Sequence, residues 1–279
     1  MNVLSPLWRN KLSRVGLIIL GIIVIGAIIA PWITPYSPNN TSFAPMLGPS
    51  MHHLLGTTQQ GQDVYSELVY GARDSLIVGW AAGILATFLA LLLGLLAGYL
   101  PGMVDEVLSY LMNIFLVIPG LPLMIILAAY APVKGDVLII FVITITGWAW
   151  GARVLRSQVM SLRSRDYIAA ARFAGDSMLR IVFREVLPNM LSLVAATFLG
   201  AAVSAILAAA GLEFLGLGDP SINSWGTMLF WAENSGALLQ GQWAWLFAPG
   251  FMIAVLGTAL VLVNFAVDEM ANPRLRKKG

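Results

Sequence analysis

The stretch GLIILGIIVIGAIIAPWI, residues 16–33, contains eighteen residues and not one charged side chain. A helix needs about 20 mainly apolar residues to cross a hydrocarbon core about 30 Å thick. The run is continuous, without the alternation of apolar and polar residues that an outer-membrane barrel strand shows. It also exceeds the apolar core of about 7–15 residues that is usual in a signal peptide, although the basic stretch 8–14 precedes it. We therefore expect a retained membrane-spanning helix.

Comparable apolar runs continue along the chain. The sequence is 58% hydrophobic and 11% charged, with a mean hydropathy of +0.82, which is too apolar for a soluble domain of 279 residues. The fourth run is marginal in length and would need an extra turn. The sequence predicts an all-α polytopic membrane protein with six spans, at 16–33, 76–100, 107–130, 137–152, 191–211 and 245–267.

Basic residues indicate the orientation of these spans. Segment 8–14, loop 153–190 and tail 268–279 contain every Lys and Arg of the chain except Arg73 and Lys134. Because cytoplasmic loops carry an excess of Lys and Arg, we expect both termini and loop 153–190 on the cytoplasmic side of the membrane. The expected organisation is 1–75 (N-terminus, first span, first outer loop), 76–267 (five-span core with loop 153–190) and 268–279 (basic tail).

Several function classes are disfavoured by composition. The net charge of +2 follows from membrane topology, so we expect lipid contacts and no nucleic-acid partner. Without cysteine, disulfides and thiolate metal sites are excluded. The adjacent His52 and His53 point opposite ways on an extended chain, so we expect ordinary loop residues and no metal site. Because the predicted spans contain no ionisable residue, an ion-coupled secondary transporter is disfavoured.

Loop 153–190 contains DYIAAARFAGDSMLRIVFREVLPNM, residues 166–190, which is charged and alanine-rich in an otherwise apolar chain. Helical spacing places four side chains on one small-residue face: Tyr167, Ala170, Ala171 and Ala174. Gly175 is expected to end this helix in the left-handed region, and Asp176 or Ser177 to cap a second one. The second helix would have an apolar face formed by Leu179, Val182, Phe183 and Val186, and would end at Pro188.

Two readings of this segment follow from its physical pattern. It could be an amphipathic segment that rests on lipid headgroups. A DNA-binding helix-turn-helix has the same outline, but a span follows directly after Pro188 and leaves little free domain to enter a groove.

The segment resembles the EAA signature of permease subunits in ATP-binding cassette importers. The matching residues are Ala169-Ala170-Ala171, Gly175, Ile181 and Leu187-Pro188. Ala169 stands where the pattern has its glutamate. The stretches 7–20, 53–79, 213–229 and 272–278 are similar to segments of the dipeptide, oligopeptide and nickel branch, except that Thr58 and Gln62 replace the usual Asp and Arg. The resemblance implies a location in a prokaryotic inner membrane.

The resemblance implies a type I importer permease fold in which the loop couples to a separate ATPase. The coupling residues would be Asp166, Tyr167, Ala169, Ala170, Ala171, Arg172, Gly175, Asp176, Ile181, Leu187 and Pro188. It further implies a homologous partner permease, two ATPase subunits that bind ATP and Mg²⁺, and an extracytoplasmic substrate-binding protein. The chain has no phosphate-binding loop motif, so we expect no enzyme activity, no catalytic residue and no cofactor in it. The substrate would be a peptide, an oligosaccharide or a nickel complex.

Two further regions are candidates for the substrate path. Pro119, Gly120 and Pro122 should break the third span, and broken helices often line cavities, although a packing kink is the alternative. Thr144 and Thr146 are lining candidates in the fourth span. The neighbouring Trp148 and Trp150 could also line the path, or anchor the span at the interface. In outer loop 212–244, we expect a docking surface or gate, or only a solvated loop, at Glu213, Asp219, Trp225 and Glu233. The rival functions are a stand-alone secondary transporter and a membrane scaffold that transports nothing.

Overall fold

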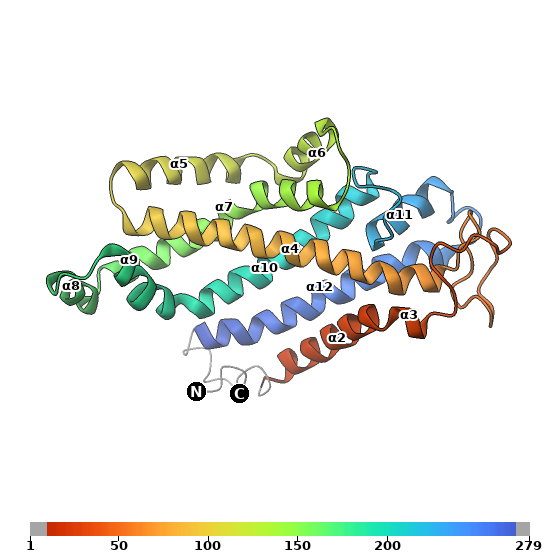
Figure 1. Ribbon diagram of the computed structural model, residues 1–279, viewed down its shortest axis with the longest axis horizontal. Helices are drawn as coiled ribbons and strands as arrows, with labels where there is room; N and C mark the ends of the chain where they lie inside the picture. The colour runs from red at the N-terminus through yellow and green to blue at the C-terminus, as the bar shows by residue number, and fades with distance from the viewer. Residues whose placement is uncertain (1–9, 272–279) are drawn as a thin grey trace.

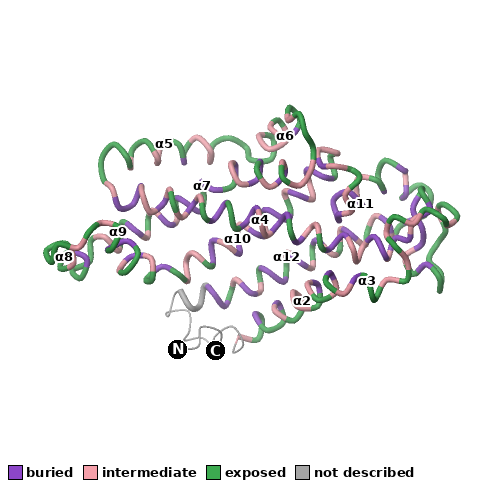
Figure 2. Tube along the Cα trace, viewed as in Figure 1, coloured by how far each residue is buried: buried purple, intermediate pink, exposed green. Residues whose placement is uncertain are grey.

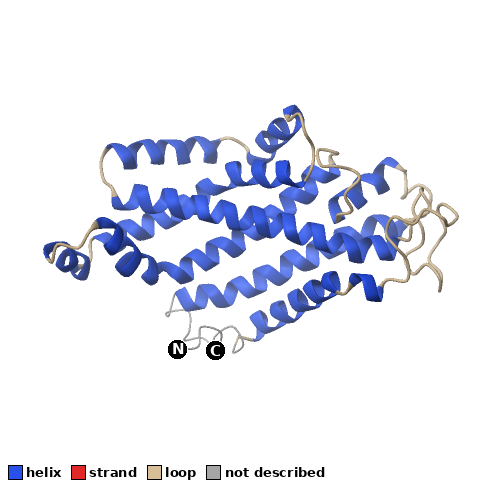
Figure 3. Ribbon diagram, viewed as in Figure 1, coloured by secondary structure: helices blue, strands red, loops and turns tan. Residues whose placement is uncertain are grey.

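The computed structural model describes residues 10–271, which are almost entirely helical (Figure 3). Arg9 and the basic tail residues of segment 272–278 lie outside the described residues. The helices are α2 (Lys11–Ile28), α3 (Ala30–Ile33), α4 (Val64–Tyr99), α5 (Met103–Val117), α6 (Gly120–Tyr130), α7 (Asp136–Arg163), α8 (Asp166–Phe173), α9 (Met178–Ile181), α10 (Leu191–Phe214), α11 (Trp225–Asn234) and α12 (Trp243–Ala271). A π turn (Val182–Val186) and a 3-10 turn (Leu187–Met190) join α9 to α10.

Five helical runs among the described residues are long and apolar enough to span a membrane. The pair α5 and α6, which meet at an angle of 89°, makes a sixth if the two helices count as one broken span. The predicted break in the third span is therefore confirmed, at residues 118–119. The fourth span is not marginal, because α7 extends without interruption to Arg163.

Several predicted boundaries were wrong. Helix α4 begins at Val64, twelve residues before the expected span, because Asp63 caps it by accepting a hydrogen bond from the Ser66 backbone N–H. The expected division between residues 75 and 76 therefore falls inside a continuous helix. The first third of loop 153–190 is likewise helical, as part of α7. Hydropathy marks the part of a helix that suits lipid, and these helices continue beyond it.

The long helices lie side by side, with α4 packed against α7 and α10, and α2 against α12 (Figure 1). One end of the bundle carries α8, α9 and the α4–α5 connection, and we call it the elbow end. The opposite end carries α3, the loop 34–63 and α11, and we call it the α11 end. Apart from Arg73 and Lys134, the described Lys and Arg residues lie in the first turn of α2, the second half of α7 and segment 165–184.

Glycines let α4 approach its neighbours closely. A Cβ added at Gly83 would lie 2.9 Å from the Ala202 Cα atom of α10, and one at Gly94 would lie 2.9 Å from the Ala152 carbonyl oxygen of α7. These glycines belong to two Gly-x-x-x-Gly patterns, at 79–83 and 94–98. Such small-residue patterns allow close backbone contact inside a membrane, where the hydrophobic effect does not drive helices together.

Candidate functional site

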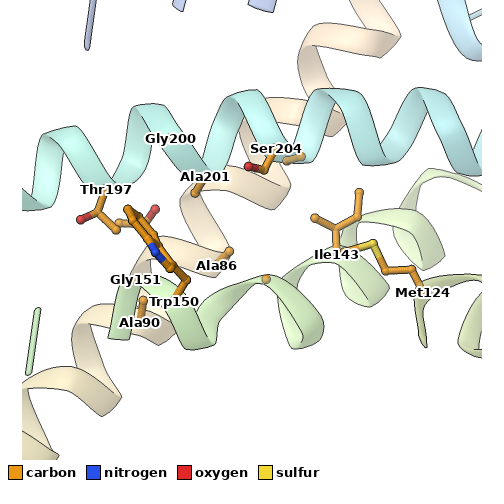
Figure 4. A pocket seen from close by; sticks show the side chains of 13 residues that line it. Ala86, Ala90, Met124, Ile143, Trp150, Gly151, Thr197, Gly200, Ala201 and Ser204 are labelled. Carbon is orange, nitrogen blue, oxygen red and sulfur yellow. The ribbon is translucent and has the colours of Figure 1, made fainter. Parts of the chain in front are cut away.

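A cavity of about 310 Å³ lies between α4, α6, α7 and α10, and we call it the central cavity. Its walls consist mostly of small residues, including Ala86 and Ala90 of α4 and Gly200 and Ala201 of α10. Figure 4 shows α10 facing Trp150 and Gly151 of α7 across this space. The cavity exists because these small side chains leave room between the helices, and its lining comes from four separate segments of the sequence.

The central cavity offers few polar groups. The hydroxyls of Thr87 and Thr197 donate to the carbonyls of Gly83 and Leu193 in their own helices, at 2.7 and 2.8 Å. The Ser204 hydroxyl has no hydrogen-bond partner among the described residues, and its side chain is exposed. No charged side chain lines this cavity among the described residues. Its surface suits passage of a neutral backbone or apolar group better than tight binding of an ion.

The residues predicted for the path lie beside the central cavity. Pro119, Gly120 and Pro122 are exposed at the start of α6, whose Met124 lines the cavity instead. Thr144 and Thr146 do not line it, and the Thr146 hydroxyl donates to the Val142 carbonyl at 2.7 Å. Their role in transport stays a prediction.

The two tryptophans of α7 have different environments. Trp148 is buried against Phe115, with ring centroids 5.4 Å apart, so the interpretation as an interfacial anchor was wrong for it. Trp150 lines the central cavity and is 60% exposed.

The segment 166–190 forms a helical elbow at the end of the bundle. Gly175 adopts φ +83°, as predicted, and donates to the Arg172 carbonyl at 3.0 Å. The Asp176 N–H donates to the Ala171 carbonyl at 3.1 Å. These two bonds form a Schellman motif, which satisfies carbonyls at the end of α8. Ser177, one of the two predicted caps, accepts from the Arg180 N–H and starts α9.

The second part of the elbow continues into the fifth span. Pro188 does not end the helix, contrary to the prediction, because it falls in the 3-10 turn that follows the π turn. The Leu187 N–H donates to Val182, five residues back, and the Asn189 side chain donates to the Glu185 carbonyl. These altered bonds accommodate the missing proline N–H and keep the helical path continuous from Met178 to Phe214.

Buried aliphatic side chains anchor the elbow to the bundle. Ile168 and Ile181 are 0% and 1% exposed, and they share one apolar cluster with Leu155 and Val159 of α7. The Arg172 guanidinium lies 5.2 Å from the centroid of the Tyr99 ring, a cation–π contact. Leu187 is half-buried against the same cluster. The elbow is therefore fixed to α7 and to the end of α4.

The predicted apolar faces of the elbow were only partly correct. Of the small-residue face, Ala171 is half-buried, and Ala170 and Ala174 are exposed; Ile168 is the residue of α8 that is buried. In the second helix, Val182 and Val186 are buried, but Leu179 and Phe183 are more than 60% exposed. The remaining predicted coupling positions Asp166, Ala169 and Pro188 are exposed, and Asp176 is half-buried. The signal missed was Ile168, the one large aliphatic residue in DYIAAARF.

An uncovered surface remains on the outside of the elbow (Figure 2). It is formed by Tyr167, Phe173, Leu179 and Phe183, and Phe173 is 93% exposed. We call these four residues the elbow patch. They lie at the elbow end of the bundle, where Arg172, Arg180 and Arg184 are also exposed.

The loop at the α11 end separates into buried and exposed residues. Trp225 is fully buried, and its indole N–H donates to the Leu68 carbonyl at 2.9 Å, so it is no docking surface. Glu213 is buried in the last turn of α10 and accepts a hydrogen bond from the Ser224 hydroxyl. Glu233 is exposed.

Asp219 belongs to the exposed part of this loop. Hydrogen bonds from the Ser221 hydroxyl and N–H hold the pKa of the Asp219 carboxyl below its ordinary value. Docking or gating by Asp219 and Glu233 stays a prediction.

The histidines differ from the expectation of two ordinary loop residues. His52 is exposed, but His53 is 6% exposed and its Nδ1 atom lies 2.9 Å from the Oδ1 atom of Asp63. The His53 ring packs against Tyr36 and Phe43. Since Asp63 also caps α4, this pair fixes the loop 34–63 to the start of the longest helix.

Comparison with known proteins agrees with this arrangement. Residues 90–277 match the family described as binding-protein-dependent transport system inner membrane component, and residues 2–50 match the N-terminal transmembrane domain of oligopeptide transport permease C. The oligopeptide transport system permease protein OppC of Bacillus subtilis is 33% identical over 270 residues, which cover 96% of this chain and 87% of that protein.

Two other relatives show similar coverage. The dipeptide transport system permease protein DppC of Alkalihalophilus pseudofirmus is 36% identical over 276 residues, covering 98% of this chain and 89% of that protein. The di/tripeptide transport system permease protein DppC of Pseudomonas aeruginosa is 34% identical over 288 residues, covering 98% and 93%. The chain therefore belongs to the family of binding-protein-dependent transport system inner membrane components.

Proposed function

We propose that this chain is the permease subunit of an ATP-driven importer whose substrates are peptides. The relatives carry peptide transport in their names, and their similarity covers nearly the whole chain. The observation that carries the proposal is the elbow, which is exposed on its outer side and anchored to the bundle on its inner side. Such a segment can receive a displacement from another subunit and pass it to the spans.

The elbow patch is the surface that a separate ATPase subunit covers. Four large apolar side chains, Tyr167, Phe173, Leu179 and Phe183, lie at the bundle end among basic residues. Large apolar side chains exposed together with basic residues at one end of the bundle are expected to be covered by a partner. ATP and Mg²⁺ bind in that subunit, and this chain supplies no catalytic group. In this proposal the elbow end and both chain termini lie in the cytoplasm, and the excess of Lys and Arg supports that orientation.

The central cavity is this chain's half of the translocation path. Its small, nearly uncharged walls suit passage of a peptide, whose amide groups find few strong partners to hold them. Trp150 is exposed at the wall, so a second, homologous permease would complete the path opposite α7 and α10. A soluble substrate-binding protein delivers the peptide at the α11 end.

Reconstitution tests the proposal directly. The chain is placed in lipid vesicles with its companion permease and ATPase subunits, and uptake of a labelled oligopeptide is measured with the binding protein outside. Uptake that requires ATP supports the proposal. Uptake that follows an ion gradient without the ATPase would indicate a secondary transporter, and assembly without any uptake would indicate a scaffold.

The absence of native cysteine allows a second test of the coupling surface. A Phe173→Cys variant should react with a membrane-impermeant maleimide only from the cytoplasmic side. ATPase binding should protect it, because Phe173 would then be covered. A Trp32→Cys variant, exposed beyond the opposite end of α2, should react only from outside and gain no protection.

A further inference from the structure

A second cavity, of about 230 Å³, lies at the α11 end, and we call it the α11 pocket. Its walls come from the loop 34–63, the first turns of α4, the α10–α11 loop, α11 and the start of α12. It shares no lining residue with the central cavity. With about 30 Å³ for each water, this volume corresponds to about eight waters, so a small organic molecule fits.

Glu67 is the charged residue of this pocket. Its side chain is 9% exposed, yet its carboxylate has neither a hydrogen bond nor an ion pair with any described residue. The carboxylate oxygens are not enclosed by protein, and they border the pocket. The Glu67 backbone is held in place, because the Asn223 side chain donates to its carbonyl at 3.0 Å.

No described group forms an ion pair or a hydrogen bond with the Glu67 carboxyl group. Asp63, one turn earlier on α4, is fully buried and already pairs with His53 and Ser66. No Lys or Arg lines the pocket among the described residues. A carboxylate removed from water without a partner is costly, so an ionised Glu67 favours a positively charged occupant.

The remaining walls indicate which kind of cation fits. One carboxylate is too few for Ca²⁺, which takes six to eight oxygen ligands, and the described residues contain no group of three metal-ligating side chains. Two indole rings line the pocket, from Trp231 and Trp245, and tryptophan attracts organic cations. The amides of Asn39 and Gln60 are exposed at the rim and have no hydrogen-bond partner among the described residues.

We propose that the α11 pocket binds the primary ammonium group of a small organic solute, with Glu67 as its counter-charge. A primary ammonium has three N–H donors, which match the Glu67 carboxylate and the amide oxygens of the rim. The pocket lies at the end where loop 34–63 meets α11, apart from the path proposed for transport. Loss of this binding would leave the proposed import of peptides untouched, so the two proposals fail separately.

Binding is measured on the full chain in lipid nanodiscs, with propylammonium as the probe and saturation-transfer NMR as the readout. Propionamide, a neutral molecule of similar size, and tetramethylammonium, a cation without N–H donors, are the comparison ligands. We expect saturable propylammonium binding and at least tenfold weaker binding of both comparison ligands, since a hydrogen-bonded ion pair discriminates on this scale. Equal binding of the three ligands overturns the proposal.

Two sets of variants test the residue assigned. Glu67→Gln keeps the shape of the side chain and should weaken propylammonium binding at least tenfold. Glu233→Gln removes an exposed carboxylate of α11 that does not line the pocket, and binding should not change. Equal affinity of the Glu67→Gln variant and the unaltered chain overturns the proposal.

Gln60 provides a test that requires no substitution of a buried residue such as Glu67. Its side chain is exposed at the pocket rim, so changing its charge should leave the fold intact. Gln60→Glu should strengthen propylammonium binding about fivefold, and Gln60→Lys should weaken it by a similar factor, as expected for a charge at the pocket edge. Opposite shifts support the proposal, and identical affinities of the two variants overturn it.

Discussion

Replacement of Gly175 by valine tests whether the elbow shape is needed for transport. Gly175 has φ +83°, which a residue with a Cβ atom adopts at a cost of about 1–2 kcal/mol. A Cβ added there would meet no described atom within 4 Å. The cost of Gly175→Val is therefore conformational strain, without a steric clash with another part of the protein.

This strain should act mainly on the elbow. A free-energy change of about 1.4 kcal/mol alters an equilibrium tenfold. A cost of about 1–2 kcal/mol therefore lowers the population of the native turn, relative to other conformations of the turn, by about 5- to 30-fold. Helix α8 has only eight residues and buries Ile168 alone, so little packing opposes the change. The membrane-spanning helices keep their own contacts. We expect peptide uptake per vesicle to fall at least fivefold, with the thermal stability of the bundle within about 1 kcal/mol of the unaltered chain.

The assay is ATP-driven uptake in vesicles, with ATP hydrolysis recorded in parallel. Gly175→Asn is the mild variant, because asparagine tolerates the left-handed region, and it should retain most of the uptake. Gly241→Val is the matched control at the opposite end. Gly241 has φ +76°, has no described atom within 4 Å of an added Cβ, and forms the same hydrogen-bond pattern, with bonds from Gly241 to Leu238 and from Gln242 to Ala237.

Two results would refute the reasoning. Full uptake by Gly175→Val would mean that the elbow geometry does not transmit movement. Equal loss in Gly175→Val and Gly241→Val would mean that strain in any such turn impairs the protein, and the elbow would have no special role.

Two further predictions concern the cavity and the α4 cap. Gly200→Leu should reduce uptake at least tenfold without loss of stability, because the new side chain fills the central cavity, where an added Cβ meets no described atom. Gly257 is an equally open glycine of α12 outside the cavity, so Gly257→Leu should transport normally. The two variants are compared by uptake assays and by thermal melting. Asp63→Ala should lower the free energy of unfolding by about 3 kcal/mol, since it removes the α4 cap and leaves the buried His53 ring without its partner. Asp219→Ala, which disrupts only an exposed turn, should cost less than about 0.5 kcal/mol in the same denaturation experiment, and equal costs would contradict the role given to the cap.

The six spans could be predicted because a lipid bilayer imposes one strong requirement on sequence, a long apolar run. The ends of the helices could not be predicted in the same way. Helix α4 begins at Val64 through a cap by Asp63 and includes the polar Glu67 and Asp74, which no hydropathy window would assign to a span. Helix α7 similarly continues through several arginines. Where a helix extends into water, local capping sets its end.

The elbow shows which parts of a site are local. The left-handed Gly175 and the cap by Ser177 depend on a few neighbouring residues, so the sequence indicated both. The buried face depends on what lies underneath it. The cluster around Leu155 and Val159 accepts Ile168, whereas Ala170 and Ala174, which share a face by spacing, are exposed. Helical periodicity identifies a face, and the rest of the bundle determines whether that face is covered.

The central cavity could not be predicted from the sequence, because it forms where the side chains are small. Alanine and glycine on α4, α7 and α10 leave space only when the three helices come together. The prolines near residue 120 correctly predicted a break, but the cavity wall is supplied by Met124 on the far side of that break. Trp225 was a candidate for an outer docking surface or gate, although it is the fully buried anchor of its loop.

The connection between the elbow and the central cavity is covalent and short. The helical path from Met178 to Phe214 runs without interruption through the π and 3-10 turns, and it includes Gly200 and Ser204 of the cavity wall. The other side of the elbow packs on α7, which supplies Trp150 and Gly151 to the same wall. Because helices are stiff along their length, we expect a movement of the elbow to act on both helices that face each other across the cavity. The spacing of α7 and α10, and with it the width of the space between them, should then change.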